Sequence, residues 1–239
     1  MAAKSFWPVL LSGFFEPVFY LFAIGVGIGQ LAGDVDVAGT AVPYAAFVAP
    51  AMLASSAMNG AVYESTNIFF KLKFGKIYDG VLATPLRPTD VASGEIAWAV
   101  TRGGAYSVVF VLVMLVMGYI RSPWGALAVP AALLIGSAFS AVGVAATTFM
   151  RSWQDMDLVT LVTLPLFLFS ATFYPLDLYP PALQALTLLS PLFHGVELCR
   201  GLALGILHWT MLINVAVLVA MGLAGWRVAT RRIGALLLK

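Results

Sequence analysis

Three residues in the last quarter of the chain carry side chains that could act together chemically. His194, Glu197 and Arg200 are spaced three apart, so a helix would place them on one face. An imidazole beside a carboxylate can hold a metal ion, but one histidine and one glutamate are fewer ligands than a typical site uses. We therefore favour ion pairing within the helix over metal binding, and a role in admitting or releasing a substrate stays open.

A second group of ionisable residues lies at the ends of apolar stretches and consists of Glu16, Glu64, Glu95 and Arg102. Charged side chains are costly inside a bilayer, where they pair with one another or mark a functional path. Glu95 and Arg102 are two helical turns apart, so Glu64 or Glu16 is the better partner for Arg102. No acidic residue falls clearly at mid-membrane, which favours a structural ion-pair cluster at the inner interface over a proton relay.

Glycines at three positions of the first apolar stretch, Gly25, Gly29 and Gly33, form overlapping G-x-x-x-G units. The letters GVGIGQLAG are superficially similar to a nucleotide-binding loop, but no strand precedes them. Within a membrane, small residues on one helix face allow another helix to approach closely. We expect packing within the protomer, with a dimer contact or a pore-lining face as the alternative.

Catalytic signatures are missing from the sequence. It contains no H-E-x-x-H, no G-x-S-x-G and no Walker A sequence, and only two histidines are present. A membrane-embedded lipid-modifying enzyme is therefore disfavoured, and we expect this chain to bind no cofactor or metal itself. If the protein does work, the energy comes from a partner.

The composition shows what kind of protein positions these residues. Hydrophobic residues make up 61% of the 239 positions and charged residues 10%, whereas a soluble domain is about half apolar and about a quarter charged. A helix crosses the bilayer with roughly 20 predominantly apolar residues. The chain is therefore an integral membrane protein, and its net charge of +2 gives no indication of nucleic-acid binding.

We predict an all-α polytopic membrane protein with a single transmembrane domain over residues 1–239. Six spans are expected, at about 14–33, 44–63, 92–120, 124–150, 158–173 and 207–228. Lysine and arginine gather in one set of connections, and the other side holds only Arg121 and Arg200. Because basic residues are retained in the cytoplasm, both termini and the segment 64–90 are expected there.

The segment 64–90 combines three lysines within six residues with a periodic apolar pattern. The apolar positions follow the spacing of one helix face and are Phe70, Phe74, Ile77 and Val81. Such a face either lies on lipid headgroups or docks into a groove of another protein. The residues alone leave both possibilities open.

Residues 174–206 are too apolar for an ordinary exposed loop. Prolines at positions 175, 180, 181 and 191 divide this stretch into pieces too short to span a bilayer. Broken backbone at membrane depth is tolerated when it is buried in protein or lines a cavity. The pattern therefore predicts a re-entrant helical hairpin on the outer side.

The sequence YESTNIFFKLKFGKIYDGVLATPLRPTDVASGEIAWAVTRG resembles the cytoplasmic signature of type-2 ABC exporter permeases, a family with nodulation-type lipo-oligosaccharide exporters and daunorubicin-type drug exporters. The matching positions are Glu64, Tyr78–Asp79, Thr84–Pro85, Asp90, Gly94 and Arg102–Gly103. SPLFHGVELCRGLALG resembles the stretch before the family's last span, and FEPVFYLFAIGVGIG its first span. The resemblance covers nearly the whole chain in order. One departure is that only MAAKSFWP precedes the first span, where family members begin with a longer amphipathic helix.

The resemblance implies the permease subunit of an ATP-driven exporter in the cytoplasmic membrane of a prokaryote, moving a lipid, glycolipid or hydrophobic drug-like substrate outward through the first, second and fifth spans. It implies a dimer with a second permease copy or a related permease, and two cytoplasmic ABC ATPase subunits that bind ATP and Mg. The segment 64–90 would contain the coupling helix, with ATPase contacts at Phe70, Phe74, Ile77, Tyr78, Asp79 and Val81. The alternative is a membrane anchor or assembly factor that transports nothing.

Overall fold

The computed structural model describes residues 18–75 and 77–237; Glu16 and Lys76 lie outside the described residues. Within those ranges, four helical segments are long and apolar enough to cross a membrane. They are α3 (Tyr44–Lys73), α5 (Pro88–Val116), η2 (Pro123–Leu127) continued by α6 (Ala128–Thr147), and α10 (Thr210–Leu237). The chain is therefore a multi-pass helical membrane protein.

A broken pair of helices follows on the outer side of the bundle. α8 (Pro181–Leu189) and α9 (Pro191–Leu204) are bent by 85° at Ser190 and would make a fifth span if counted together. Ser190 caps α9 because its side chain accepts a hydrogen bond from the Phe193 amide. This break lies within the stretch for which the prolines predicted a helical hairpin.

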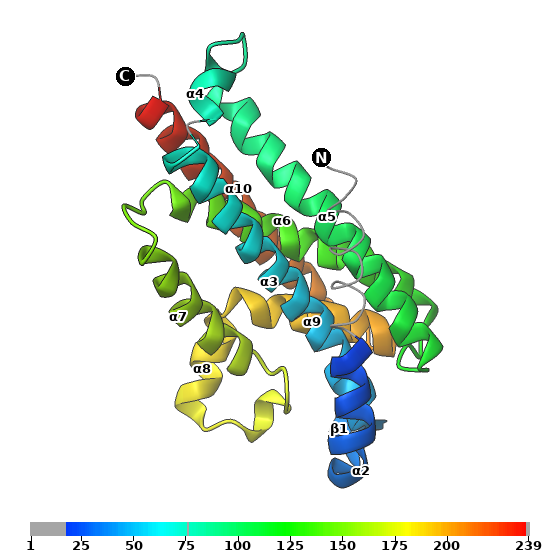
Figure 1. Cartoon of the computed structure of the whole chain (residues 1–239). Coiled ribbons are helices and arrows are strands. Elements are labelled where there is room, and N and C mark those ends of the chain that lie inside the picture. The colour runs from blue at the N-terminus through cyan, green and yellow to red at the C-terminus, as the bar shows by residue number, and fades with distance from the viewer. Residues whose placement is uncertain (1–17, 76, 238–239) are drawn as a thin grey trace.

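The long helices α3, α5, α6 and α10 run side by side (Figure 1). α4 (Ile77–Leu82) and the C-terminal end of α10 lie at one end of this bundle, while α2 (Gly29–Ala32) and β1 (Asp34–Val37) lie at the other. We call these the inner and the outer end, after the orientation that the lysines and arginines predict. Side chains from α3, α6, α9 and α10 fill the main core, among them Phe47, Met58, Ile135, Leu192 and Leu218. The two ends of the bundle are therefore built from different parts of the sequence.

The first outer connection is a β-hairpin, so the expectation of a purely α-helical chain is wrong here. β1 (Asp34–Val37) pairs antiparallel with β2 (Thr40–Pro43). The turn is closed by the Asp36 carboxylate, which accepts a hydrogen bond of 2.7 Å from the Gly39 amide, and Gly39 has a φ of +80°. Alternating valines and a two-residue turn at Ala38–Gly39, closed by the Asp36 carboxylate, favour a hairpin.

The helices extend beyond the apolar stretches that predicted them. α3 begins at Tyr44 as expected but ends at Lys73 rather than 63, and α5 begins at Pro88 rather than 92. Hydropathy marks where the lipid ends, but a helix continues as long as its residues tolerate helical backbone. The Asp90 carboxylate caps the start of α5 by accepting a hydrogen bond from the Arg87 amide.

The first and fifth predicted spans differ from the other four. Residues 18–32 are helical and include a π-helical segment, Ala23–Ile28, but the expected start at 14 lies outside the described residues. α7 (Asp155–Leu168) has 14 residues and no buried side chain, which is shorter than the roughly 20 residues that cross the hydrocarbon. The six-span count therefore stays a prediction.

Close packing of α10 on α6 depends on a glycine. A Cβ atom at Gly225 would lie 2.7 Å from the Val142 amide nitrogen and 2.8 Å from the Ala141 carbonyl carbon. Both are backbone atoms, so rotating a side chain cannot relieve the clash. The two helices approach as closely as they do because this position has no side chain.

We expect Gly225→Ala to destabilise the protein by about 1–3 kcal/mol, the usual cost of overpacking. Thermal unfolding in detergent, followed by size-exclusion chromatography of heated samples, measures the effect. Gly94→Ala is the matched control, because a Cβ atom at Gly94 meets nothing within 4 Å. Equal thermal midpoints for Gly225→Ala and Gly94→Ala would contradict the close packing of α10 on α6.

Candidate functional site

The segment after α3 is divided into two helices. The Phe74 and Gly75 amides both donate to the Phe70 carbonyl at 3.0 Å, which ends α3, and α4 starts at Ile77. The prediction that Phe70, Phe74, Ile77 and Val81 share one helix face is therefore wrong. The physical reason is that the Phe74 and Gly75 amides share the Phe70 carbonyl, which ends the helix beside glycine, a weak helix former.

Three of these four residues are nevertheless exposed together at the end of the bundle. Phe70, Phe74 and Ile77 are 56%, 61% and 51% exposed, and the Phe70 and Phe74 ring centroids are 5.6 Å apart. We call these three residues the cytoplasmic apolar patch, after the side on which the distribution of lysine and arginine predicts them. Val81 packs against the buried cluster beneath α4 instead. Exposed large apolar side chains in one group usually mark a contact with another molecule.

α4 is fixed to the long helices through one carboxylate. Glu95 of α5 accepts a hydrogen bond of 2.8 Å from the Tyr78 hydroxyl and pairs with the Lys71 ammonium at 2.9 Å. Burial, together with the negative charge of Glu95, raises the pKa of the Tyr78 phenol, so it remains a donor. The side chain of Tyr78, which was expected to contact an ATPase, is buried and faces inward. We call Lys71, Tyr78 and Glu95 the Glu95 node.

The inner polar cluster forms two separate groups rather than one. Arg102 pairs with the buried Glu64 and also donates to the Tyr106 hydroxyl at 3.4 Å. Glu64 accepts a further hydrogen bond from Asn67 at 3.2 Å. Glu95 belongs to the node described above, and Glu16 lies outside the described residues. The pairing of α3 with α5 through Glu64 and Arg102 is one of the two that the sequence proposed.

A line of polar side chains runs along α3 on the side away from the core. Ser56 is partly exposed, and Asn59, Tyr63 and Asn67 are exposed. Their spacing of three, four and four residues follows one helix face. We call these four residues the α3 polar stripe. Polar side chains on a membrane span normally face a water-filled path or another helix rather than lipid.

The stripe begins at a small cavity where several elements meet. The cavity has a volume of about 60 Å³ and lies between the first helical stretch, α3, α5 and α7. Tyr20 lines it from the first stretch, Asn59 from α3 and Phe167 from α7. The first, second and fifth predicted spans therefore approach one another at this point.

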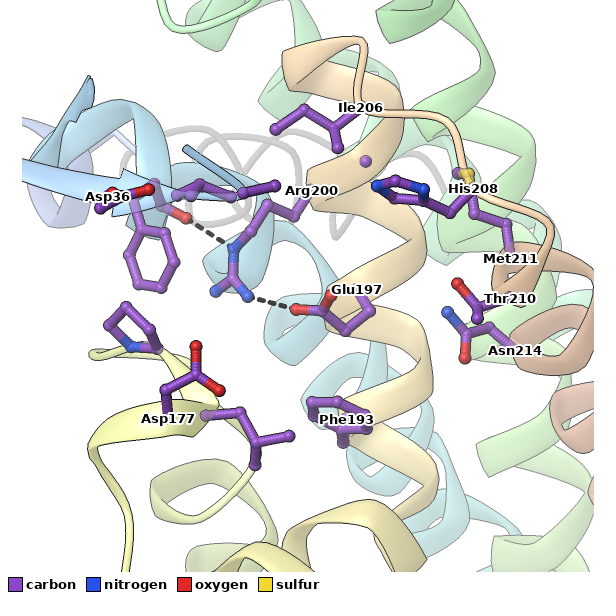
Figure 2. Close-up of a pocket in the computed structure, with 16 residues that line it drawn as sticks. Asp36, Asp177, Phe193, Glu197, Arg200, Ile206, His208, Thr210, Met211 and Asn214 are labelled. Carbon is purple, nitrogen blue, oxygen red and sulfur yellow. Dashed lines mark hydrogen bonds and ion pairs between the residues drawn. The ribbon is translucent and has the colours of Figure 1, made fainter. Parts of the chain in front are cut away.

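The outer end of the bundle contains a larger pocket of about 330 Å³ (Figure 2). It lies between the β-hairpin, the 3₁₀ turn η3 (Leu176–Leu178), α9 and the start of α10. Carboxylates from three of these elements line it: Asp36, Asp177 and Glu197. The labelled side chains converge on the pocket from separate parts of the chain, so its shape depends on how these elements are held together.

Arg200 is buried and connects α3, α9 and the segment after α7. Its guanidinium donates to the Ala171 carbonyl at 2.6 Å and to the Phe47 carbonyl at 3.3 Å, and it pairs with Glu197 at 2.6 Å. The guanidinium carbon also lies 3.9 Å from the centroid of the Phe47 ring. Arg200 therefore holds α3, α9 and the segment after α7 in one arrangement.

Of the three α9 residues singled out from the sequence, two bond to each other and the third bonds to α10. Glu197 and Arg200 form the expected pair within α9, whereas the His194 imidazole bonds the Asn214 side chain of α10 at 2.8 Å. Among the residues that the structure describes, no group of three potential ligands could hold a metal ion. This geometry fits the ion-pair interpretation better than the metal one.

The glycines of the first stretch do not form one packing face. Cβ atoms at Gly25 and Gly29 would contact the Ala45 side chain at 3.8 and 3.9 Å, and Gly25 also lies against the Tyr119 ring. Gly33 differs, because it has a φ of +68° and turns the chain into β1. The expectation of a three-glycine face is therefore wrong at Gly33.

Comparison with known proteins decides the class. A family model described as ABC-2 type transporter matches residues 2–204. The chain belongs to the ABC-2 type transporter family. Nodulation protein J of Rhizobium leguminosarum bv. viciae is 33% identical over 200 residues, which cover 82% of this chain and 75% of that protein. Inner membrane transport permease YadH of Escherichia coli K12 is 26% identical over 217 residues, covering 89% and 83%.

Membership in the ABC-2 family makes this chain a multi-pass membrane transport permease. The matched residues include the cytoplasmic apolar patch, the Glu95 node, the α3 polar stripe and Arg200. The stripe is the part of the ABC-2 chain that the sequence interpretation missed. Its signal was present, because Ser56, Asn59, Tyr63 and Asn67 follow helical spacing within an otherwise apolar segment.

Replacing the buried arginine should loosen the outer end. Arg200→Met removes the donor to the Ala171 carbonyl and the partner of the Glu197 carboxylate, and we expect a loss of about 2–3 kcal/mol, typical of a hydrogen bond to a charged group. The thermal midpoint in detergent measures this loss. Arg121→Met, at an exposed outer position, serves as the control and should change the midpoint little. A midpoint for Arg200→Met equal to that of the control would show that Arg200 does not hold these elements.

Proposed function

We propose that this chain is the permease subunit of an ATP-driven exporter in the inner membrane of a bacterium. α4 and the cytoplasmic apolar patch contact a cytoplasmic ABC ATPase, and two ATPase subunits act on a permease dimer. Both termini lie in the cytoplasm, in agreement with the distribution of lysine and arginine. The observation that carries the proposal is the exposed apolar patch at the end of α3, a helix of 30 residues.

Helix length supports this position. α3 has 30 residues, a length of about 45 Å at 1.5 Å per residue. The hydrocarbon is about 30 Å thick, and headgroups add about 5–8 Å on each side. When α3 starts at the outer boundary, its inner end extends about 15 Å past the hydrocarbon. That distance favours a protein partner over lipid headgroups as the contact of the patch.

The attachment of α4 supports a mechanical role. The Glu95 node joins α4 to the ends of α3 and α5, and the buried cluster of Tyr78, Val91 and Ile233 packs it against α5 and α10. A force applied at the patch is thus transmitted to three spans. Because the family normally works with ABC ATPases, that force would come from ATP binding and hydrolysis in the partner.

The transport path in this proposal follows the α3 polar stripe. Asn59 and Tyr63 are exposed in the single chain, and a second permease copy facing them would enclose the path between the two subunits. Aromatic side chains such as Tyr20 and Phe167 beside Asn59 suit a substrate with both apolar and polar parts. A lipid, glycolipid or hydrophobic drug-like molecule has this character.

Negative charge on the cytoplasmic apolar patch should prevent the ATPase from binding. We expect Phe74→Glu/Ile77→Glu to reach the membrane normally but to lose co-purification of an ABC ATPase in mild detergent, because carboxylates in an apolar contact are left unpaired. Leu31→Glu is the control, since Leu31 is 90% exposed at the outer end. Retention of a stoichiometric ATPase by the double variant would rule out this docking surface. Absence of any ATPase from the unmodified protein would favour a membrane anchor instead.

Water should reach the α3 polar stripe. In a Cys199→Ser background, we expect Asn59→Cys to react with a membrane-impermeant maleimide in purified membranes at least about tenfold faster than Leu112→Cys. Leu112 is 53% exposed on α5 and faces lipid in this account. Thiols react as thiolates, which do not form in hydrocarbon. Equal, slow labelling of both positions would place the stripe in lipid or in a dry contact.

A further inference from the structure

The connection between α6 and α7 and the end of α10 form a basic and aromatic group at the inner end of the bundle. We define the inner rim as Phe149, Arg151, Trp153 and Arg232. Phe149 and Trp153 are 56% and 52% exposed, and Arg151 is exposed. The Trp153 ring packs on the buried Phe69 of α3 at 6.1 Å between centroids, which fixes the rim against the bundle.

Arg232 is held in place but lacks an anionic partner in the described part of the chain. Its guanidinium carbon lies 4.1 Å from the centroid of the Phe149 ring, and Nη2 donates to the Thr148 carbonyl at 3.2 Å. Its Nε is buried without an acceptor. Buried donors are seldom left unsatisfied in native proteins, so the geometry indicates an acceptor outside the described residues.

The nearest acidic group of this loop is already engaged. The Asp155 carboxylate accepts hydrogen bonds from the Arg151 amide at 2.6 Å and from the Ser152 amide at 3.2 Å. It closes its own turn rather than pairing with Arg232. The remaining carboxylate of this turn, Asp157, is exposed on α7. The positive charge of Arg232 therefore remains available to an external anion.

The position of the inner rim along the membrane normal indicates that its contact is lipid. α10 begins at Thr210, and roughly 20 residues cross the hydrocarbon. Arg232 therefore lies about two to three residues, or about 4 Å, beyond the inner boundary, at the level of the phosphates. The cytoplasmic apolar patch lies about 10 Å further from the membrane by the same reckoning. The rim is thus at headgroup depth, whereas the patch is beyond it.

Apolar side chains continue from the rim toward the centre of the membrane. Val228 of α10 and Val142 of α6 are 40% and 39% exposed, and Val228 lies one helical turn before Arg232 on α10. The surface therefore offers an anion contact at its inner end and an apolar contact above it.

We propose that the inner rim binds an anionic phospholipid of the inner leaflet, with the phosphate on Arg232 and an acyl chain along Val142 and Val228. Basic pockets between spans on the cytoplasmic side are suited to such headgroups. The aromatic side chains of Phe149 and Trp153 lie at the depth where amphipathic rings collect. The Phe69 ring lies between this site and the patch proposed to contact the ATPase, because it packs on both Trp153 and Phe74.

Native mass spectrometry of the detergent-purified chain tests the site with phosphatidylglycerol and phosphatidylcholine as probes. The unmodified protein should retain phosphatidylglycerol preferentially, and Arg232→Gln should weaken that retention about tenfold. Arg227→Gln, an exposed arginine on a different face of α10, is the matched control and should behave as the unmodified protein. Arg232→Lys, which keeps the charge, should keep most of the preference and guards against an effect of misfolding.

Three results would overturn the proposal. One is equal retention of the two lipids by the unmodified protein. Another is an equal loss of phosphatidylglycerol retention in Arg232→Gln and Arg227→Gln, which would reflect general surface charge. The third is loss of a co-purified ATPase in Arg232→Gln with phosphatidylglycerol retention unchanged, which would make the rim a protein contact. Inorganic phosphate alone should leave the thermal midpoint unchanged, because the acyl contact is part of the site.

Discussion

The thickness of the bilayer is the constraint on which the rest of this structure depends. Backbone that crosses hydrocarbon must satisfy its own hydrogen bonds, so the spans are helices. α3 and α5 have 30 and 29 residues, about ten more than the hydrocarbon requires. In the proposed placement, this excess forms an extension of the bundle on one side of the membrane. α4 is mounted on that extension, and the exposed patch of Phe70, Phe74 and Ile77 lies at its end.

Two charged residues, Glu95 and Arg200, connect the helices at the two ends of the bundle. At the inner end, Glu95 fixes α4 to α3 and α5, so α4 moves only with them. At the outer end, Arg200 joins α3, α9 and the segment after α7. α3 takes part in both groups. A displacement at the patch therefore reaches the outer pocket through one continuous helix, and α7, which buries no side chain, is the element least restrained by the rest.

The sequence predicted the membrane class, four of the spans and the broken outer helices, because hydropathy and proline act locally. It also proposed the pairing of Glu64 with Arg102 and of Glu197 with Arg200. The sequence-based prediction failed where contacts between different helices determine the structure. Glu95 could not be assigned to Lys71 and Tyr78 from spacing, because the three residues come from different helices. The break at Gly75 was hidden by an apolar pattern that continues across it, and the valine alternation of the hairpin was masked by the aspartates beside it.

The central claim is that the Glu95 node transmits movement from α4 to the outer end. The most direct measurement uses spin labels at the exposed outer residues Leu178 and Trp124, in a Cys199→Ser permease–ATPase complex, with and without ATP and vanadate. The account predicts a distance change between the labels in this complex. It predicts no change when Glu95→Leu is added, although the ATPase still co-purifies and hydrolyses ATP. An unchanged movement in the Glu95→Leu complex would contradict the account.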